Sequence, residues 1–142
     1  MNKLIAAVLI FLLFFEFFGC AALREKFAKA AGLETMQLVA VNPRYDDNGE
    51  LLTAQYELHW NGRECEQFGG VFENGAMGKL FGLALYPGPS GKYGTDRVFL
   101  AGGESPEDWL IWNYGEPMGA FILCKEKTVT DIPDGFVPFG SE

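Results

Sequence analysis

Hydrophobic residues follow two different patterns along the chain. The first 20 residues include 16 hydrophobic ones, and Leu4–Phe15 is an unbroken apolar run. Beyond Gly32, hydrophobic and polar residues alternate, which is the pattern of half-buried strands. The change of pattern predicts an N-terminal hydrophobic segment at residues 1–20, a short helical stalk at residues 21–32 and a single β-domain at residues 33–142.

Seven short strands are predicted in the β-domain. Asn-Gly pairs at residues 48–49, 61–62 and 74–75 are typical of the tight turns between antiparallel strands. The predicted strands are Met36–Val41, Leu51–Trp60, Arg63–Glu73, Met77–Tyr86, Arg97–Ala101, Trp109–Tyr114 and Ala120–Val129. This succession with little helix predicts an all-β fold, either an antiparallel β-sandwich or a small barrel.

Two long loops and a tail complete the predicted domain. The loops are expected at residues 86–96 and 102–108, and long loops on a rigid scaffold commonly carry binding residues. Residues 132–142 include Pro133 and Pro138, which interrupt strand pairing. We therefore expect the C-terminus to be a tail laid over the surface of the domain.

The stalk at Ala21–Ala31 has helical spacing. Leu23 and Phe27 share one helical face, and Gly32 is placed to cap the C-terminal end. The helix also carries a basic collar, made of Arg24, Lys26 and Lys29. Such a collar would suit a position against anionic lipid headgroups.

The N-terminal segment resembles the signal of bacterial lipoproteins. Met1–Lys3 is a short positive start, Leu4–Phe15 has the length of a signal's apolar core, and Gly19 precedes Cys20. In that family the signal is removed before an invariant cysteine, which then carries the lipid. The resemblance therefore implies that a lipid on Cys20 anchors the protein to a membrane.

Two alternatives to lipidation remain open. Phe17 and Phe18 stand where the family has leucine and a small residue, and Glu16 puts a charge near the cut. Leu4–Leu23 is long enough to span a bilayer as an uncleaved anchor, and the signal can also be cut for plain secretion. Each alternative puts the domain at a membrane or outside the cytoplasm. We expect it in the cell envelope, facing the periplasm or the cell exterior.

The other two cysteines form an even pair once Cys20 is set aside. Cys65 and Cys124 lie in predicted strands of an exported domain, which favours a disulfide bond between them. In the chain-entropy model, a bond that closes a loop of this size stabilises the fold by roughly 4 kcal/mol. The alternative is two buried free thiols, because the sequence does not show that the two residues meet.

The β-domain is acidic. The whole chain has a net charge of −8, and residues 33–142 contain 17 acidic and 7 basic residues. Binding to nucleic acid depends on clustered lysine and arginine, so this class of ligand is excluded. An acidic surface keeps a domain soluble and also suits a basic protein partner.

No residues for catalysis, metal binding or cofactor binding match a known signature. His59 is the only histidine, and its distance of six residues from Cys65 matches no nucleophile pair. Asp46–Gly49 has the composition of a hairpin turn, and an EF-hand loop would need acidic ligands where Arg44 and Gln55 stand. We therefore predict a protein that is not an enzyme and that holds no cofactor and no metal.

The predicted strand Trp109–Tyr114 carries aromatic side chains on both faces. Trp112 and Tyr114 share one face, whereas Trp109 shares the other with Ile111. If the second face is exposed, Trp109 would stack on a sugar or on a partner side chain. Packing of these rings in the core is the alternative.

A Ser-Gly-Lys-Tyr segment lies in the first long loop, at Ser90, Gly91, Lys92 and Tyr93. Together with Trp112–Glu116 and Cys124, it resembles the periplasmic and membrane-bound inhibitors of chicken-type lysozyme. Those proteins are small β-barrels, often lipoproteins, whose Ser-Gly-x-x-Tyr loop enters the lysozyme cleft. The loop here is one residue shorter, and Tyr114 stands where the family has lysine. The sequence thus predicts a membrane-tethered binding or structural module of the cell envelope, with lysozyme inhibition as the alternative.

Overall fold

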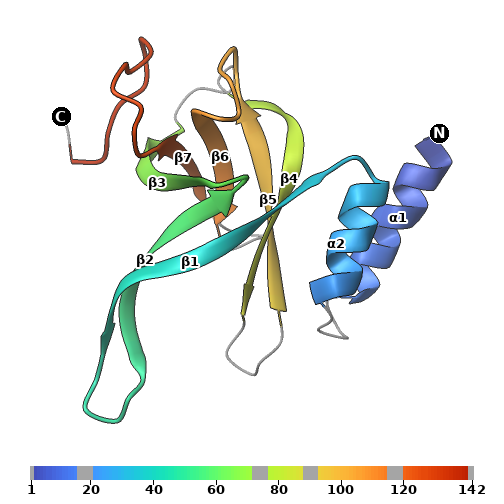
Figure 1. Cartoon of the computed structure of the whole chain (residues 1–142), viewed down its shortest axis with the longest axis horizontal. Coiled ribbons are helices and arrows are strands. Elements are labelled where there is room, and N and C mark those ends of the chain that lie inside the picture. Colours follow the sequence, from blue (N-terminus) through green and yellow to red (C-terminus); the bar gives the residue numbers. More distant parts are fainter. Residues whose placement is uncertain (1, 16–20, 72–76, 88–92, 115–119, 141–142) are drawn as a thin grey trace.

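A closed barrel of seven strands forms the body of the protein (Figure 1). The structure is a computed structural model that describes residues 2–15, 21–71, 77–87, 93–114 and 120–140. The strands are β1 (Glu34–Tyr45), β2 (Leu51–Trp60), β3 (Arg63–Gly70), β4 (Met77–Pro87), β5 (Tyr93–Ala101), β6 (Trp109–Tyr114) and β7 (Ala120–Glu126). Around the barrel they follow the order β1-β2-β3-β7-β6-β5-β4. The prediction of a small all-β barrel is confirmed, and the sandwich alternative is wrong.

The barrel closes through a parallel pairing of β1 with β4. Residues Glu34–Gln37 pair with Gly82–Leu85, whereas every other strand pair is antiparallel. At this seam the two backbones approach so closely that a β-carbon on Gly82 would meet the carbonyl oxygen of Glu34. A glycine is therefore needed at this position, and the expectation of an entirely antiparallel sheet is wrong at this one seam.

Apolar side chains fill the inside of the barrel. The buried set is Met36, Leu38, Leu58, Cys65, Ala84, Val98, Leu110, Trp112 and Cys124. Trp112 packs edge to face against Tyr56, with ring centroids 6.4 Å apart, and its indole Nε1 donates a hydrogen bond of 2.9 Å to Asp96. A small barrel filled in this way is a packed core.

The C-terminal tail covers the outer face of β3 and β6. Phe136 packs edge to face on Trp109 with ring centroids 4.8 Å apart. The backbone N–H of Phe139 donates to the carbonyl of Phe68 at 2.8 Å, and Pro138 forms an isolated bridge with Gly69. The predicted tail laid over the surface is confirmed, and it creates a second apolar cluster outside the barrel.

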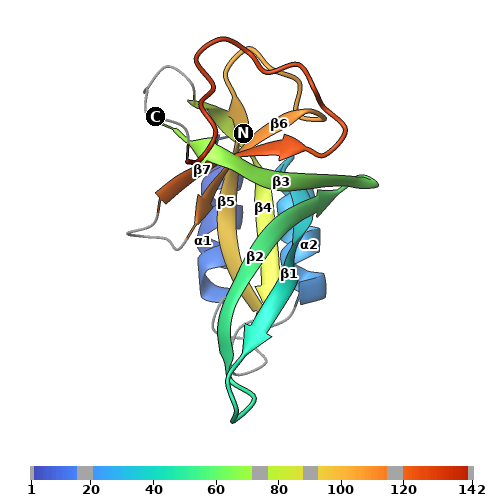
Figure 2. The ribbon, with the colours of Figure 1, turned by 90° about the vertical axis from the view of Figure 1, so that its left-hand side faces the viewer.

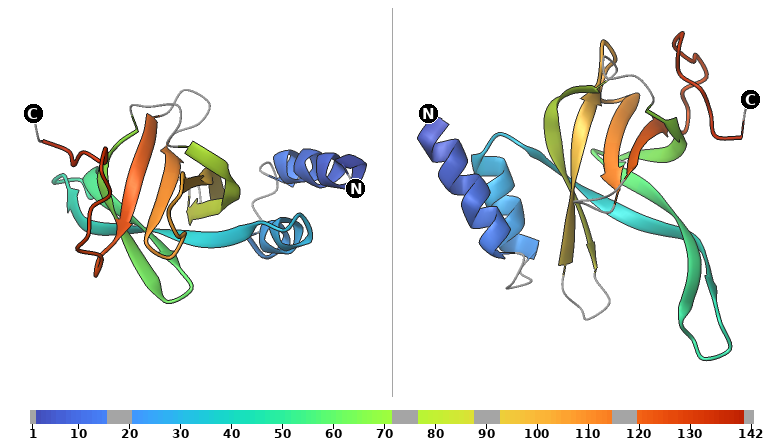
Figure 3. Two further views of the ribbon diagram at one scale, coloured as in Figure 1. Left: turned by 90° about the horizontal axis from the view of Figure 1, so that it is seen from above. Right: turned by 180° about the vertical axis from the view of Figure 1, so that it is seen from behind.

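Two helices, α1 (Asn2–Phe15) and α2 (Ala21–Ala30), lie side by side outside the barrel (Figure 3). Ala28 of α2 packs on Leu83 of β4, and Val8 of α1 joins the same cluster. The predicted cap is present, because Gly32 has a φ of 74° and the N–H of Leu33 donates to the carbonyl of Ala28. Within the described residues, none of the helices is long and apolar enough to cross a membrane.

The hairpin of β1 and β2 extends well beyond the barrel as an arm (Figure 2). We define the arm as residues 41–55, where β1 and β2 pair with each other but not with β3 or β4. The pairing shifts between Val41 and Arg44, where Asn42 has a φ of 51°. This bulge accommodates Pro43, which has no N–H for the ladder, and β1 continues to Tyr45 instead of ending at Val41 as predicted.

Candidate functional site

The tip of the arm exposes large hydrophobic side chains. Tyr45 is 59%, Leu51 48% and Leu52 62% exposed. Tyr45 lies directly opposite Leu51 in the pairing of β1 with β2, so both side chains are on one face of the ribbon. These residues were not predicted from the sequence. The adjacent leucines nevertheless break the alternation, so that at least one of them must face outward.

The turn at the tip is held by its own side chain. Asp46 accepts hydrogen bonds through Oδ1 from the backbone N–H groups of Asn48 and Glu50, at 2.9 and 2.8 Å. This is the hairpin turn that the sequence predicted, and its carboxylate is used within the turn. The tip therefore presents apolar side chains beside the acidic residues Asp47 and Glu50.

A polar cluster lies on the outer wall of the barrel, formed by Glu57, His59, Glu64 and Lys127. His59 Nε2 is 3.1 Å from Glu57 Oε1. Lys127 Nζ is 2.9 Å from Glu57 Oε2 and 3.0 Å from Glu64 Oε2. Two carboxylates from β2 and β3 thus share the ammonium of the residue that follows β7.

The charges of the polar cluster stabilise one another. Burial would raise the pKa of Glu57, but its hydrogen bonds with Lys127 and His59 outweigh burial and hold the pKa below its usual value. Hydrogen bonds to Glu57 and Glu64 raise the pKa of Lys127 to about 12. Glu57 is therefore ionised and Lys127 protonated at neutral pH, so neither serves as a general acid or base there.

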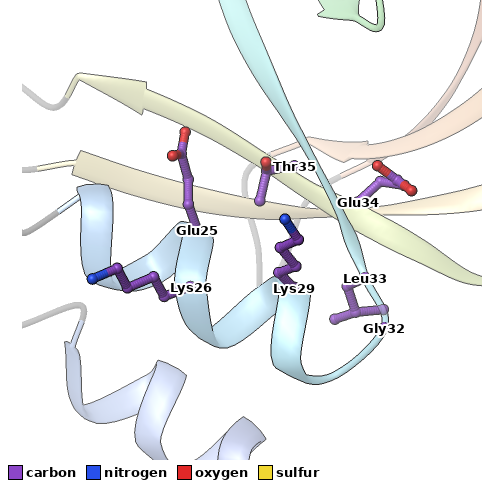
Figure 4. Close-up of a pocket in the computed structure, with 7 residues that line it drawn as sticks. All are labelled: Glu25, Lys26, Lys29, Gly32, Leu33, Glu34 and Thr35. Carbon is purple, nitrogen blue, oxygen red and sulfur yellow. The ribbon is translucent and has the colours of Figure 1, made fainter.

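A polar cavity of about 590 Å³ lies between α2 and the start of β1 (Figure 4). Its lining residues are Glu25, Lys26, Lys29, Gly32, Leu33, Glu34 and Thr35. Glu34 accepts a hydrogen bond of 3.3 Å from the indole of Trp60. The lining contains two lysines and two glutamates, so its charges sum to zero. The cavity therefore does not attract an anion more strongly than a zwitterion.

Trp109 does not form an exposed binding surface. Its side chain is 1% exposed and is enclosed by Phe68 and Phe136, whose ring centroids lie 5.0 and 4.8 Å away. The prediction that Trp109 contacts a partner is wrong, because the C-terminal tail buries the face on which it lies.

The lipidation and inhibitor segments fall largely outside the described residues. Cys20 lies there, as do Ser90, Gly91 and Lys92. The backbone of Tyr93 is described as the first residue of β5, where it pairs with Pro87 at the end of β4. Residues 88–92 therefore connect two neighbouring antiparallel strands, β4 and β5.

Cys65 and Cys124 are free thiols in the core of the barrel. Cys65 pairs with Glu126, two residues after Cys124, so the two cysteines are diagonal neighbours on adjacent strands. Burial raises the pKa of Cys65 to about 11, and it also raises the pKa of Cys124, with Cys65 adding to the effect. The structure corresponds to the alternative of two buried thiols and does not contain the predicted disulfide.

Comparison with protein families, with curated protein sequences and with solved structures found no match to this chain.

Proposed function

We propose that the protein is a membrane-tethered, extracytoplasmic binding module of the cell envelope that contacts a protein partner through the tip of its arm. The observation that carries the proposal is the exposure of Tyr45 and Leu51 on one face of a ribbon that stands clear of the barrel, with exposed Leu52 on its other face. Exposed apolar side chains gathered on a projection commonly mark an interaction site.

The packed interior supports a binding site on the outside of the protein. Trp112, Tyr56 and the buried residues around them occupy the barrel, which makes it unlike barrels that hold a ligand inside. The helices and the tail cover parts of the outer wall. The arm is a surface that both projects from the barrel and offers large apolar groups.

The side chains at the tip of the arm indicate what kind of surface a partner would need. Tyr45 is an aromatic side chain of the type enriched at interface hot spots, and the two leucines beside it supply further apolar area. Asp47 and Glu50 flank these residues. The partner is therefore a protein with an apolar depression rimmed by lysine or arginine, and salt would slow its association with the arm.

The tether is proposed from the sequence and is consistent with the position of α2. The first residue of α2 is Ala21, which follows Cys20 directly. Figure 1 shows the start of α2 and the tip of the arm in the lower half of the view, on opposite sides of the barrel. A lipid on Cys20 would hold the barrel and its arm at the membrane, where a membrane-bound partner is within reach.

Site-specific photo-cross-linking tests the arm directly. A photoreactive amino acid in place of Leu52 should give a discrete cross-linked adduct in intact cells, whereas the same group at exposed Thr130, just before the tail, should not. Serine substitutions at Tyr45 and Leu51 should remove the adduct while the barrel stays folded. Absence of an adduct at position 52, or equal adducts at both positions, would contradict the proposal.

Lysozyme inhibition is the second candidate function. It is supported by the resemblance of the Ser-Gly-Lys-Tyr segment to the inhibitor loop, and that segment lies in the chain between the paired ends of β4 and β5. The acidic domain would suit a basic lysozyme. Residues 21–142 added to a lysozyme turbidity assay should inhibit lysis, and replacement of Ser90 and Tyr93 by alanine should remove the effect. No inhibition at micromolar concentration would reject this function.

A further inference from the structure

Three side chains of the polar cluster that can bind metal converge on the outer wall of β2 and β3. Glu57 and His59 are two residues apart on β2, so they face the same side of the strand. The strand register then places Glu64 directly opposite His59. One ligand atom from each of the three side chains lies within 4.8 Å of the other two.

The types and spacing of these ligands match Zn²⁺. Tetrahedral Zn²⁺ binds imidazole nitrogen and carboxylate oxygen at about 2.0–2.1 Å, which puts neighbouring ligand atoms about 3.3 Å apart. His59 Nε2 and Glu57 Oε1 are already 3.1 Å apart. Ca²⁺ and Mg²⁺ fit less well, because they require six or more oxygen ligands and do not favour imidazole.

The polar cluster already surrounds a cationic group, the ammonium of Lys127. The ammonium of Lys127 lies between the two carboxylates, 2.9 Å from Glu57 and 3.0 Å from Glu64. Its side chain is 39% exposed and is attached just beyond the end of β7, so it can turn into solvent without moving a strand. Glu64 is 52% exposed and can likewise move toward a bound ion.

We propose that Glu57, His59 and Glu64 bind a divalent transition metal, with Zn²⁺ the best fit, and that Lys127 competes with the metal for the same place. The three side chains supply three ligands, and water fills the fourth position because the cluster faces solvent. The metal and the Lys127 ammonium cannot occupy the cluster together, since both use the same carboxylate oxygens.

Titration with Zn²⁺ and nuclear magnetic resonance of His59 test this site. His59 is the only histidine in the chain, so its imidazole gives a single set of resonances to follow. Zn²⁺ should shift them and saturate at about one molar equivalent. In Lys127→Met the dissociation constant should fall at least about tenfold, because even in bulk water one charge about 4 Å from a divalent ion has an effect of this size.

Matched variants separate metal binding from a general effect of charge. Glu64→Gln should weaken binding strongly, whereas Glu66→Gln should not, because Glu66 lies on the same strand but pairs with Lys125 instead. Circular dichroism checks that both variants remain folded. The site is rejected if about 1 mM Zn²⁺ leaves His59 unshifted in both the wild type and Lys127→Met. Equal weakening by the two glutamine substitutions would also reject it.

Discussion

Gly82 is the residue on which closure of the barrel depends. A β-carbon there would meet the carbonyl group of Glu34 and would lie 3.1 Å from the terminal methyl of Met36. We expect Gly82→Ala to lower the free energy of unfolding by about 2 kcal/mol, because the seam between β1 and β4 must open to make room. Urea denaturation measures this change, and an unaltered midpoint would show that the seam does not need glycine.

The buried cysteines have a chemical consequence of their own. The thiolate is the reactive form of cysteine, and the pKa of Cys65 is raised to about 11. At pH 8 we expect the thiol of Cys65 in the reduced, folded protein to be alkylated about a hundredfold more slowly than a free thiol. The rate should rise as the pH increases toward 11, because the thiolate fraction grows.

Alkylation with iodoacetamide and mass spectrometry measure this rate. Cys124 should be at least as unreactive, since burial raises its pKa as well. Unfolding in guanidinium should make both residues react at the rate of an ordinary thiol. Equal rates in the folded and unfolded protein would contradict the burial of these side chains.

The residues whose environment was wrongly predicted from the sequence depend on contacts between segments that are distant in the chain. The alternation of residues correctly places Trp109 and Ile111 on one face of the strand and Leu110 and Trp112 on the other. It does not show that both faces are buried, because Phe136, which covers Trp109, lies in the irregular tail. The polar cluster was missed for the same reason, since Lys127 comes from beyond the last strand.

Most strands could be predicted because their alternation and turn residues agree. Trp109–Tyr114 and Leu51–Trp60 have the predicted bounds. β1 runs four residues further than predicted, to Tyr45, because a bulge at Asn42 lets the strand continue past Pro43. β5 begins at Tyr93, ahead of the predicted Arg97, because Gly94 and its neighbours pair with the end of β4.

The C-terminal tail stabilises the fold as an element of its own. Phe136 packs on Trp109 within the second apolar cluster. We expect Phe136→Ala to lower the free energy of unfolding by about 2 kcal/mol, less than for a fully buried phenylalanine, because the side chain is partly exposed. The emission of Trp109 should shift to longer wavelength as water reaches the ring.

Phe139 provides the matched control for this prediction. It lies in the same tail but is 56% exposed. Phe139→Ala should change the free energy of unfolding by no more than about 0.5 kcal/mol. If the two substitutions have equal effects in thermal unfolding followed by fluorescence, the tail does not pack on Trp109 as described.

At the scale of the whole molecule, the sequence could not distinguish a barrel from a sandwich. The distinction depends on the pairing of β1 with β4, two strands that are not consecutive in the chain. No turn signal marks this pairing, because it is parallel and its partners come from different hairpins. Gly82, which permits the close approach, reads in the sequence as an ordinary interruption of a strand.

If the protein is exported, a disulfide bond between Cys65 and Cys124 stays a prediction from the sequence. Cys65 and Cys124 occupy diagonal positions on adjacent strands, and both are free thiols in the structure. We expect no free thiol at these two positions in the exported, denatured protein, and reduction should destabilise the fold by roughly 4 kcal/mol. Two free thiols per molecule in a thiol assay would contradict the bond.

The proposed tether at Cys20 determines where the barrel and its arm can act. Intact-mass spectrometry of the protein extracted from membranes tests it most directly, with Cys20→Ser as the control. We predict a chain that begins at Cys20 and carries the added mass of fatty acyl groups, and no such species from the variant. A chain that begins at Met1, or one cut at this region without added lipid, would contradict the tether.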